Sequence, residues 1–167
     1  MGVMIEQQIE KKVLAKIEGR LNNAGIEKVQ LVGQLDAVEG VKGIEASDND
    51  VIIIAKSSPR SYSTPTIPTC QINVDVNALV RADIDYNGMN YLAVSGKLMD
   101  IFQHWQRCYI DTHEDFTIAD EFDCTGFQLG GGTFTLDATG KTWHYQHSFT
   151  VFGVVLENLN NNNENEV

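Results

Sequence analysis

The chain has 167 residues, of which 43% are hydrophobic, and its formal net charge at pH 7 is -11. This length and composition are those of one globular domain with a buried core. The excess of carboxylates excludes tight nucleic-acid binding, because phosphate recognition needs clustered Lys and Arg. No apolar run approaches the roughly 20 residues of a membrane span, and the N-terminus becomes charged too early for a signal peptide. We therefore expect a soluble protein made inside the cell.

The charge is unevenly distributed along the chain. Residues 1–107 hold 11 basic against 13 acidic residues, whereas residues 108–167 hold Lys141 alone against 10 acidic residues. A requirement for solubility explains this acidic excess as well as a specific function does. The three cysteines, Cys70, Cys108 and Cys124, are odd in number and widely spaced. This usage indicates reduced thiols and neither a disulfide framework nor a paired-cysteine zinc site.

The first third of the chain predicts one helix and two strands. Residues 3–22 form an amphipathic pattern that ends near Gly25, a residue suited to a left-handed helix cap. The apolar side of this helix holds Ile5, Ile9, Val13, Ile17 and Leu21, and the charged residues Glu6, Glu10, Lys12, Lys16 and Arg20 lie elsewhere. Strands follow at 28–35 and 50–57, joined by a turn region with Gly40 and Gly43. The second is almost wholly apolar, which indicates a central strand.

A proline-bearing segment and a long strand come next. Residues 58–70 contain Pro59, Pro65 and Pro68 among Ser and Thr, which predicts an extended loop or arm. Residues 71–86 alternate between apolar even positions and mostly polar odd positions, with Leu79 the exception. This period of two predicts a half-buried strand of unusual length.

The second half predicts a helix, an acidic loop and a hairpin. Residues 86–90 form a turn, and Tyr91, Ser95, Leu98, Phe102 and Trp105 form one stripe of a helix over 91–108. Residues 111–123 hold six carboxylates and no cation, and we expect a loop there. Two strands around the turn Asp137–Lys141 complete the pattern, and residues 158–167 form a disordered polar tail.

Together these elements predict an α+β fold in a single domain over residues 1–157. Strands joined by short turns favour a mainly antiparallel sheet of about five strands, with the two helices packed on one face. The even side of the long strand would bury itself against the helices, and the other face of the sheet would stay polar.

The residues that could carry chemistry form no recognisable catalytic or binding pattern. His144 and His147 lie three positions apart on a strand and therefore point to opposite faces. Asp111, His113, Glu114 and Asp115 could bind a hard cation but lack the ladder of a calcium loop. Gly130, Gly131 and Gly132 lack the lysine and helix of a phosphate loop and indicate a bulge or a flexible strand end. His104, beside Trp105, has the character of a packed or solvated histidine. We expect no catalytic residue, metal site or cofactor.

The order of the elements resembles that of the tail terminator proteins of long-tailed bacteriophages. The resemblance covers residues 3–157 and rests on organisation: an N-terminal helix, the segment "IPTCQINVDVNALVRADIDYNG", the helix "YLAVSGKLMDIFQHW" and the final strand "KTWHYQHSFTVFGVVLE". It implies a structural, non-enzymatic virion protein that forms a homo-hexameric ring at the head-proximal end of the tail. Its implied partners are the tail tube protein and a head-tail connector or neck protein, and DNA would pass through the ring without specific binding.

Other functions remain open at this point. A tail tube or other head-tail connector subunit is the nearest alternative, because such proteins also build rings from extended strands. A small metal-dependent hydrolase using residues 111–115, or a ligand-binding module with an apolar pocket, belongs to a different class.

Overall fold

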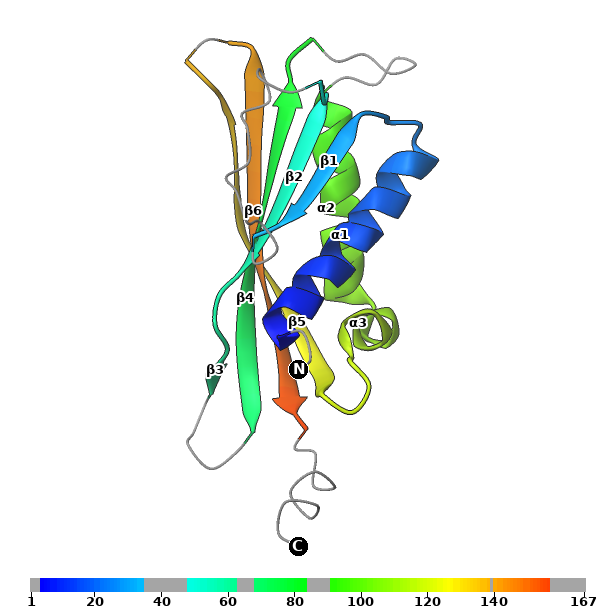
Figure 1. Ribbon diagram of the computed structural model, residues 1–167, viewed down its shortest axis with the longest axis vertical. Coiled ribbons are helices and arrows are strands. Elements are labelled where there is room, and N and C mark those ends of the chain that lie inside the picture. Colours follow the sequence, from blue (N-terminus) through cyan, green and yellow to red (C-terminus); the bar gives the residue numbers. More distant parts are fainter. Residues whose placement is uncertain (1–3, 35–47, 63–67, 84–90, 139, 157–167) are drawn as a thin grey trace, which may run out of the picture.

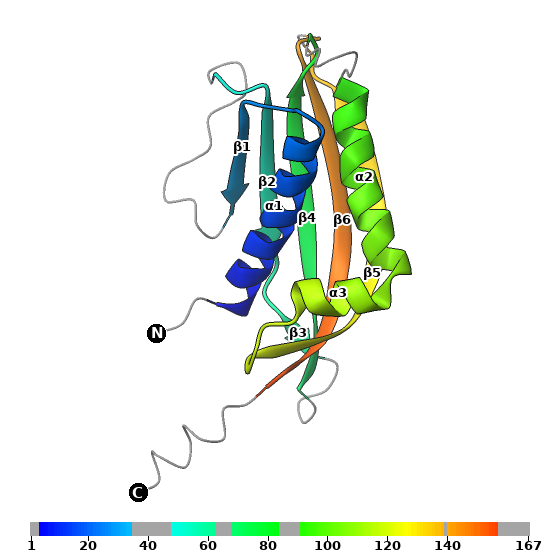
Figure 2. The same ribbon diagram turned by 90° about the vertical axis from the view of Figure 1, so that its right-hand side faces the viewer.

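The computed structural model describes residues 4–34, 48–62, 68–83, 91–138 and 140–156, and every structural statement below refers to these residues. It contains a single twisted sheet with helices on one side (Figures 1 and 2). The elements in chain order are α1 (Ile5–Asn23), β1 (Val29–Gly33), β2 (Val51–Ser57), β3 (Ser61–Tyr62), β4 (Thr69–Arg81), α2 (Tyr91–Arg107), α3 (Tyr109–Phe116), β5 (Phe122–Leu136) and β6 (Thr142–Val155).

The α+β class and the mainly antiparallel sheet are confirmed, but the details differ from expectation. The sheet has six strands in the order β1-β2-β4-β6-β5, with β3 paired separately to β4, and three helices accompany it. β1 pairs with β2 in parallel, so the expectation that consecutive strands pair antiparallel is wrong here. A parallel pair needs a crossover connection, and the stretch between Gly33 and Val51 is long enough to supply one. Most of that stretch, with Gly40 and Gly43, lies outside the described residues.

Helix α1 has the apolar side that its sequence predicts. Its buried apolar side chains are Ile5, Ile9, Val13, Leu14, Ile17 and Leu21. The helix ends at the expected place, because Gly25 adopts a φ of 77° and Ile26 N–H donates to Leu21 O at 3.0 Å. Glu6 and Glu10, expected outside the apolar side, are also buried.

Strand β4 lies between β2 and β6 in the sheet, and buried and exposed residues alternate along it as expected. Every even position from Cys70 to Val80 is buried, whereas the odd positions are exposed or half-buried. At about 3.3 Å per residue, its 13 residues span about 40 Å. The expected range of 71–86 is wrong at both ends. The strand begins at Thr69, and Ala82 and Asp83 lie in a turn; residues 84–90 lie outside the described residues.

Helix α2 covers β4, β6 and β5 (Figure 2), and its aromatic side chains pack on the sheet. Phe102 and Trp105 are fully buried, and both rings pack on Phe149 of β6, with centroids 5.4 and 5.8 Å away. Leu98 of the expected stripe is buried as well. Ser95 is only half-buried, and its hydroxyl donates to Leu92 O at 2.9 Å.

Helix α3, which ends at Phe116, replaces the first six residues of the acidic loop expected at 111–123. Phe116 anchors it, because this ring is fully buried with its centroid 4.6 Å from that of Trp105. The Thr112 hydroxyl donates to Trp105 O at 2.6 Å, which ties the first turn of α3 to the end of α2. A helix of eight residues is marginal alone, so these tertiary contacts stabilise what the local sequence does not.

The final hairpin of β5 and β6 agrees with the sequence. Its ladder contains a register shift between Leu129 and Gly132, so the three glycines form the expected bulge. At the bulge, His147 Nε2 lies 3.0 Å from Gly130 O, and His147 Nδ1 lies 3.0 Å from the Tyr145 hydroxyl. The buried imidazole thereby joins the two strands where their regular ladder is interrupted.

Candidate assembly surface

The face of the sheet opposite the helices carries polar side chains along β4 and β6. Gln71, Asn73, Asp75 and Asn77 of β4 alternate with buried residues, and the register places them beside Phe152, Thr150, Ser148 and Gln146 of β6. Thr150 Oγ1 donates to Asn73 Oδ1 at 2.7 Å, and His144 Nε2 lies 2.9 Å from Asn77 Oδ1. Toward β2 the same face turns apolar, where Ile52 is fully buried opposite Leu79.

The two edges of the sheet differ in length and run in opposite directions. β5 has 15 residues and β1 has 5, and among the described residues no further strand pairs with the outer edge of either. In the first half of β5, side chains accept hydrogen bonds from two backbone N–H groups. Leu129 N–H donates to Gln106 Oε1 at 2.6 Å, and Cys124 N–H donates to Thr117 Oγ1 at 3.1 Å. From Gly130 to Leu136 nearly every residue is exposed, so this half is the accessible part of the edge.

Most described carboxylates of the second half gather at one end of the molecule and not on the open sheet face; Asp137, at the turn between β5 and β6, is the exception. Glu114 and Asp115 belong to α3, and Asp120, Glu121 and Asp123 follow at the start of β5, at the lower end in Figure 1. Lys16 is the cation that approaches this group, with Nζ 3.5 Å from Asp115 Oδ2. We call this region the acidic end.

The base of the proline-bearing segment is fixed to α1 by buried carboxylates. Glu6 accepts hydrogen bonds from the guanidinium of Arg60, at 2.7 Å from Nε and 3.0 Å from the terminal nitrogen. Burial by itself raises the pKa of Glu6, but these hydrogen bonds and the charge of Arg60 outweigh it, so the pKa is lowered. Glu10 Oε2 accepts from Ser57 N–H at 2.7 Å and from its hydroxyl at 2.6 Å.

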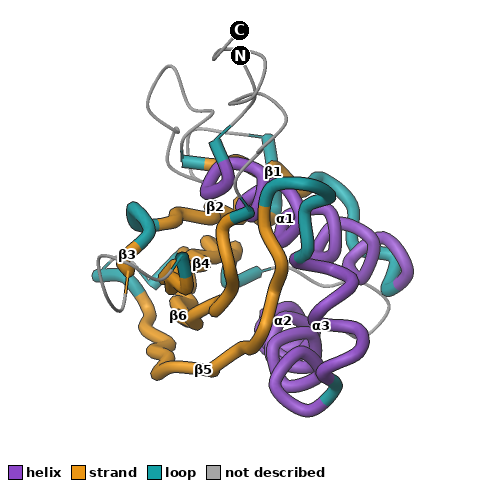
Figure 3. The backbone as a smooth tube through the Cα atoms, turned by 90° about the horizontal axis from the view of Figure 1, so that it is seen from below, coloured by secondary structure: helices purple, strands orange, loops and turns teal. Residues whose placement is uncertain are grey.

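The described ends of segment 58–70 therefore lie on the folded domain, whereas the sequence predicts an extended loop or arm. Ser61 and Tyr62 form β3, which lies antiparallel on Cys70 and Gln71, and Thr69 already belongs to β4 (Figure 3). Residues 63–67 lie outside the described residues.

The histidines and carboxylates weighed from the sequence are dispersed. His144 and His147 point to opposite faces of the sheet, as predicted, since one reaches Asn77 and the other packs against Phe102. His113 Nε2 lies 2.8 Å from Asp123 Oδ1, and Asp115 accepts from Trp105 Nε1 at 2.8 Å. The side chains of residues 111–115 thus have separate partners and do not converge as one cation site.

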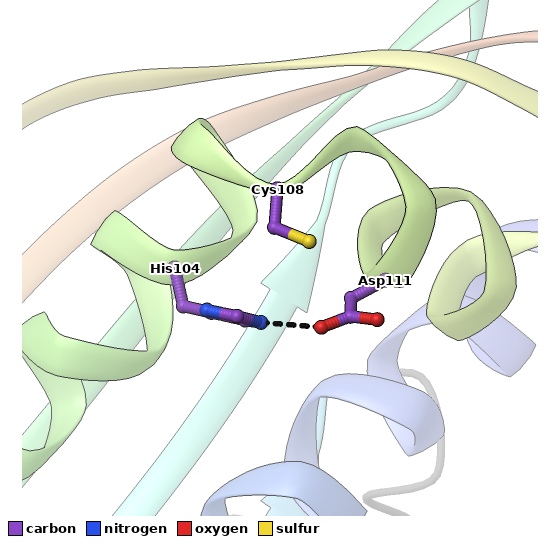
Figure 4. Close-up of side chains that lie close together, drawn as sticks. All are labelled: His104, Cys108 and Asp111. Atoms are coloured by element: carbon purple, nitrogen blue, oxygen red, sulfur yellow. Dashed lines mark hydrogen bonds and ion pairs between the residues drawn. The ribbon is translucent and has the colours of Figure 1, made fainter.

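The structure does bring together three residues that the sequence analysis did not combine. His104 Nε2 lies 2.7 Å from Asp111 Oδ2, and Cys108 Sγ is directed toward the same point (Figure 4). Hydrogen bonds from His104 and Cys108 hold the pKa of the Asp111 carboxyl below its usual range. The signal in the sequence was the four-residue spacing of His104 and Cys108 on a helix. The mistaken loop assignment of Asp111 concealed it.

A groove between α1 and α2 lies beside His104. It encloses about 510 Å³ and is lined by Lys16, Arg20, Asp100 and His104, among others. Arg20 and Asp100 face each other across it at 3.7 Å. Its charged rim does not suit the apolar ligand that a binding module would require.

Comparison with known proteins adds no relative. No protein-family model matches the chain, and no curated protein matches it. Within the described part of the chain, no helix combines the length and apolarity needed to cross a bilayer.

Proposed function

We propose that this protein is a structural, non-enzymatic component of a long-tailed bacteriophage virion, a tail terminator that forms a homo-oligomeric ring at the head-proximal end. In this role it caps the finished tail tube and joins it to a head-tail connector or neck protein. The observation that carries the proposal is the sheet itself. Three strands of 13 to 15 residues form a surface with helices on one face, polar side chains on the other and an accessible edge at β5.

The direction of the edge strands supports assembly by repetition of one contact. β5 and β6 are antiparallel, as are β6 and β4 and also β4 and β2, whereas β2 and β1 are parallel. β1 therefore runs opposite to β5, so a second copy placed beside β5 in the same orientation presents its β1 antiparallel. Such a head-to-tail contact between identical subunits closes into a ring when the rotation between them closes. Main-chain pairing at an exposed edge is a common mode of association.

The acidic end supports the passage of DNA without binding. The open sheet face carries Lys56 and Arg81 as well as Asp75, so its charge is mixed. In contrast, the carboxylates of α3 and the start of β5 gather at one end, where a duplex would meet repulsion. We infer that the acidic end, and not the polar sheet face, borders the DNA path of the ring.

Deletion of the gene from its phage tests the proposal. Loss of a terminator gives tails of uncontrolled length that do not join heads, which negative-stain images reveal directly. Loss of a tail tube subunit, the nearest alternative, gives no tails. Normal infectious particles without the gene product would overturn both assignments.

A further inference from the structure

We propose that His104, Cys108 and Asp111 form a binding site for a zinc-like transition-metal ion at the corner between α2 and α3. The inference goes beyond the ring-forming role and does not depend on it. It also departs from the expectation of no metal site that followed from the sequence.

The three residues offer a nitrogen, a sulfur and an oxygen ligand to one point. Their ligand atoms all lie within 4.8 Å of one another. Zinc bound by such atoms at about 2.0 to 2.3 Å places neighbouring ligands about 3.3 to 3.7 Å apart. The 2.7 Å hydrogen bond between His104 and Asp111 must therefore open by about 0.6 to 1 Å to admit an ion. Both side chains are about half exposed, so small rotations suffice.

The donor set decides which class of ion fits. Thiolate and imidazole favour borderline-soft ions such as Zn²⁺ or Co²⁺ over Mg²⁺ and Ca²⁺, which prefer oxygen ligands. Three protein ligands leave the fourth tetrahedral position to water. Cys108 is available for this role, because it is a free thiol and its side chain makes no capping hydrogen bond at the start of α3.

The surroundings hold the three ligands in place without using them. The Thr112 hydroxyl shares its hydrogen between two backbone oxygens, Trp105 O at 2.6 Å and Cys108 O at 2.8 Å, and so ties the corner together. Trp105 Nε1 donates to Asp115, which also faces Lys16. The positive charge of Lys16 is therefore balanced by a carboxylate outside the cluster. The corner is thus fixed by contacts that remain when an ion binds. A bound ion would lock the end of α2 to α3 as an additional cross-link.

Co²⁺ titration of the full chain, kept reduced with a phosphine, tests the site. We expect one equivalent to bind, with the thiolate charge-transfer band and the visible bands of a tetrahedral ion, and Zn²⁺ to displace it. Cys108→Ser should abolish the charge-transfer band, and His104→Gln should weaken Co²⁺ binding at least tenfold.

His113→Gln supplies the matched control. His113 pairs with Asp123 at 2.8 Å and both are about half exposed, as in the pair of His104 and Asp111, but the described residues place no cysteine with this second pair. The control should bind Co²⁺ within twofold of the unaltered protein. Absence of the charge-transfer band in the unaltered chain, or its persistence in Cys108→Ser, would overturn the proposal. Equal weakening by His104→Gln and His113→Gln would do so as well.

Discussion

The side chain of Arg60 compensates the buried negative charge of Glu6. Its guanidinium is the bidentate partner of Glu6, whose side chain is only 4% exposed. Removal of one partner of a buried pair leaves the other charge uncompensated, which is far more destabilising than loss of a surface pair.

Arg60→Ala should lower the free energy of unfolding by about 3 kcal/mol, measured by urea denaturation at pH 7. Arg20→Ala is the control. Arg20 meets Asp100 at 3.7 Å with both side chains about half exposed, and such pairs contribute about 0 to 1 kcal/mol. Equal effects of the two substitutions would contradict the importance of the buried pair.

His147 predicts a dependence of stability on pH. Burial lowers its pKa, although the hydrogen bond to Gly130 O acts in the opposite direction. The unfolded chain therefore binds the proton more readily, so the stability contributed by neutral His147 is complete above about pH 6.5 and is lost as the pH falls below that value.

The fall in melting temperature between pH 7.5 and pH 5 should be steeper for the unaltered chain than for His147→Gln. Comparison of slopes, and not of absolute stabilities, removes the cost of the lost hydrogen bonds from the argument. His113→Gln, at a half-exposed histidine, should keep the steep slope. A slope unchanged in His147→Gln would show that another group governs this range.

Among the elements, β4 shows most clearly that one face of the sheet is buried and the other is exposed. Val76 is fully buried beneath the helices, and its neighbour Asp75 lies half-buried on the open face. Val76→Asp should prevent folding, because an unpaired buried charge costs more than about 4 kcal/mol. Asp75→Asn should fold with a native circular dichroism spectrum. Similar behaviour of the two variants would mean that this register is wrong.

The exposed half of β5 is the element that the proposed ring uses. Leu136 lies on this edge and is 46% exposed. A lysine there discourages strand pairing between molecules. Leu136→Lys should leave the melting temperature within a few degrees but fail to rescue a phage that lacks the gene.

Leu92→Lys is the control for this experiment, because Leu92 is 53% exposed on α2, outside the strands of the sheet and outside the acidic end. It should rescue the phage as well as the unaltered protein does. A folded Leu136→Lys variant that rescues fully would exclude the β5 edge as the contact between subunits.

For the whole molecule, the Asn-rich tail remains a prediction, since residues 157–167 lie outside the described residues. Apart from Leu159 and Val167 the segment after Asn158 is polar, so it offers too little apolar surface to offset its ordering entropy. Truncation after Asn158 should leave the melting temperature nearly unchanged. A fall of more than a few degrees would show that the tail docks on the folded chain or on a neighbour.

The sequence by itself determined the parts of this protein whose periodicity is long and regular. The apolar side of α1, the alternation of β4, the stripe of α2 and the alternation of β6 each belong to an element of 13 or more residues, so the burial pattern is visible locally. The opposite orientation of His144 and His147 follows from the same period of two.

Only the tertiary structure decided the features that depend on contacts between distant segments. The parallel pairing of β1 with β2, the helix α3 and the burial of Glu6 each need a partner outside their own element: β2, Trp105 and Arg60. The meeting of His104, Cys108 and Asp111 likewise depends on the corner between two helices. Local propensity carries no information about such partners, because packing supplies most of the free energy that fixes short helices and buried charges.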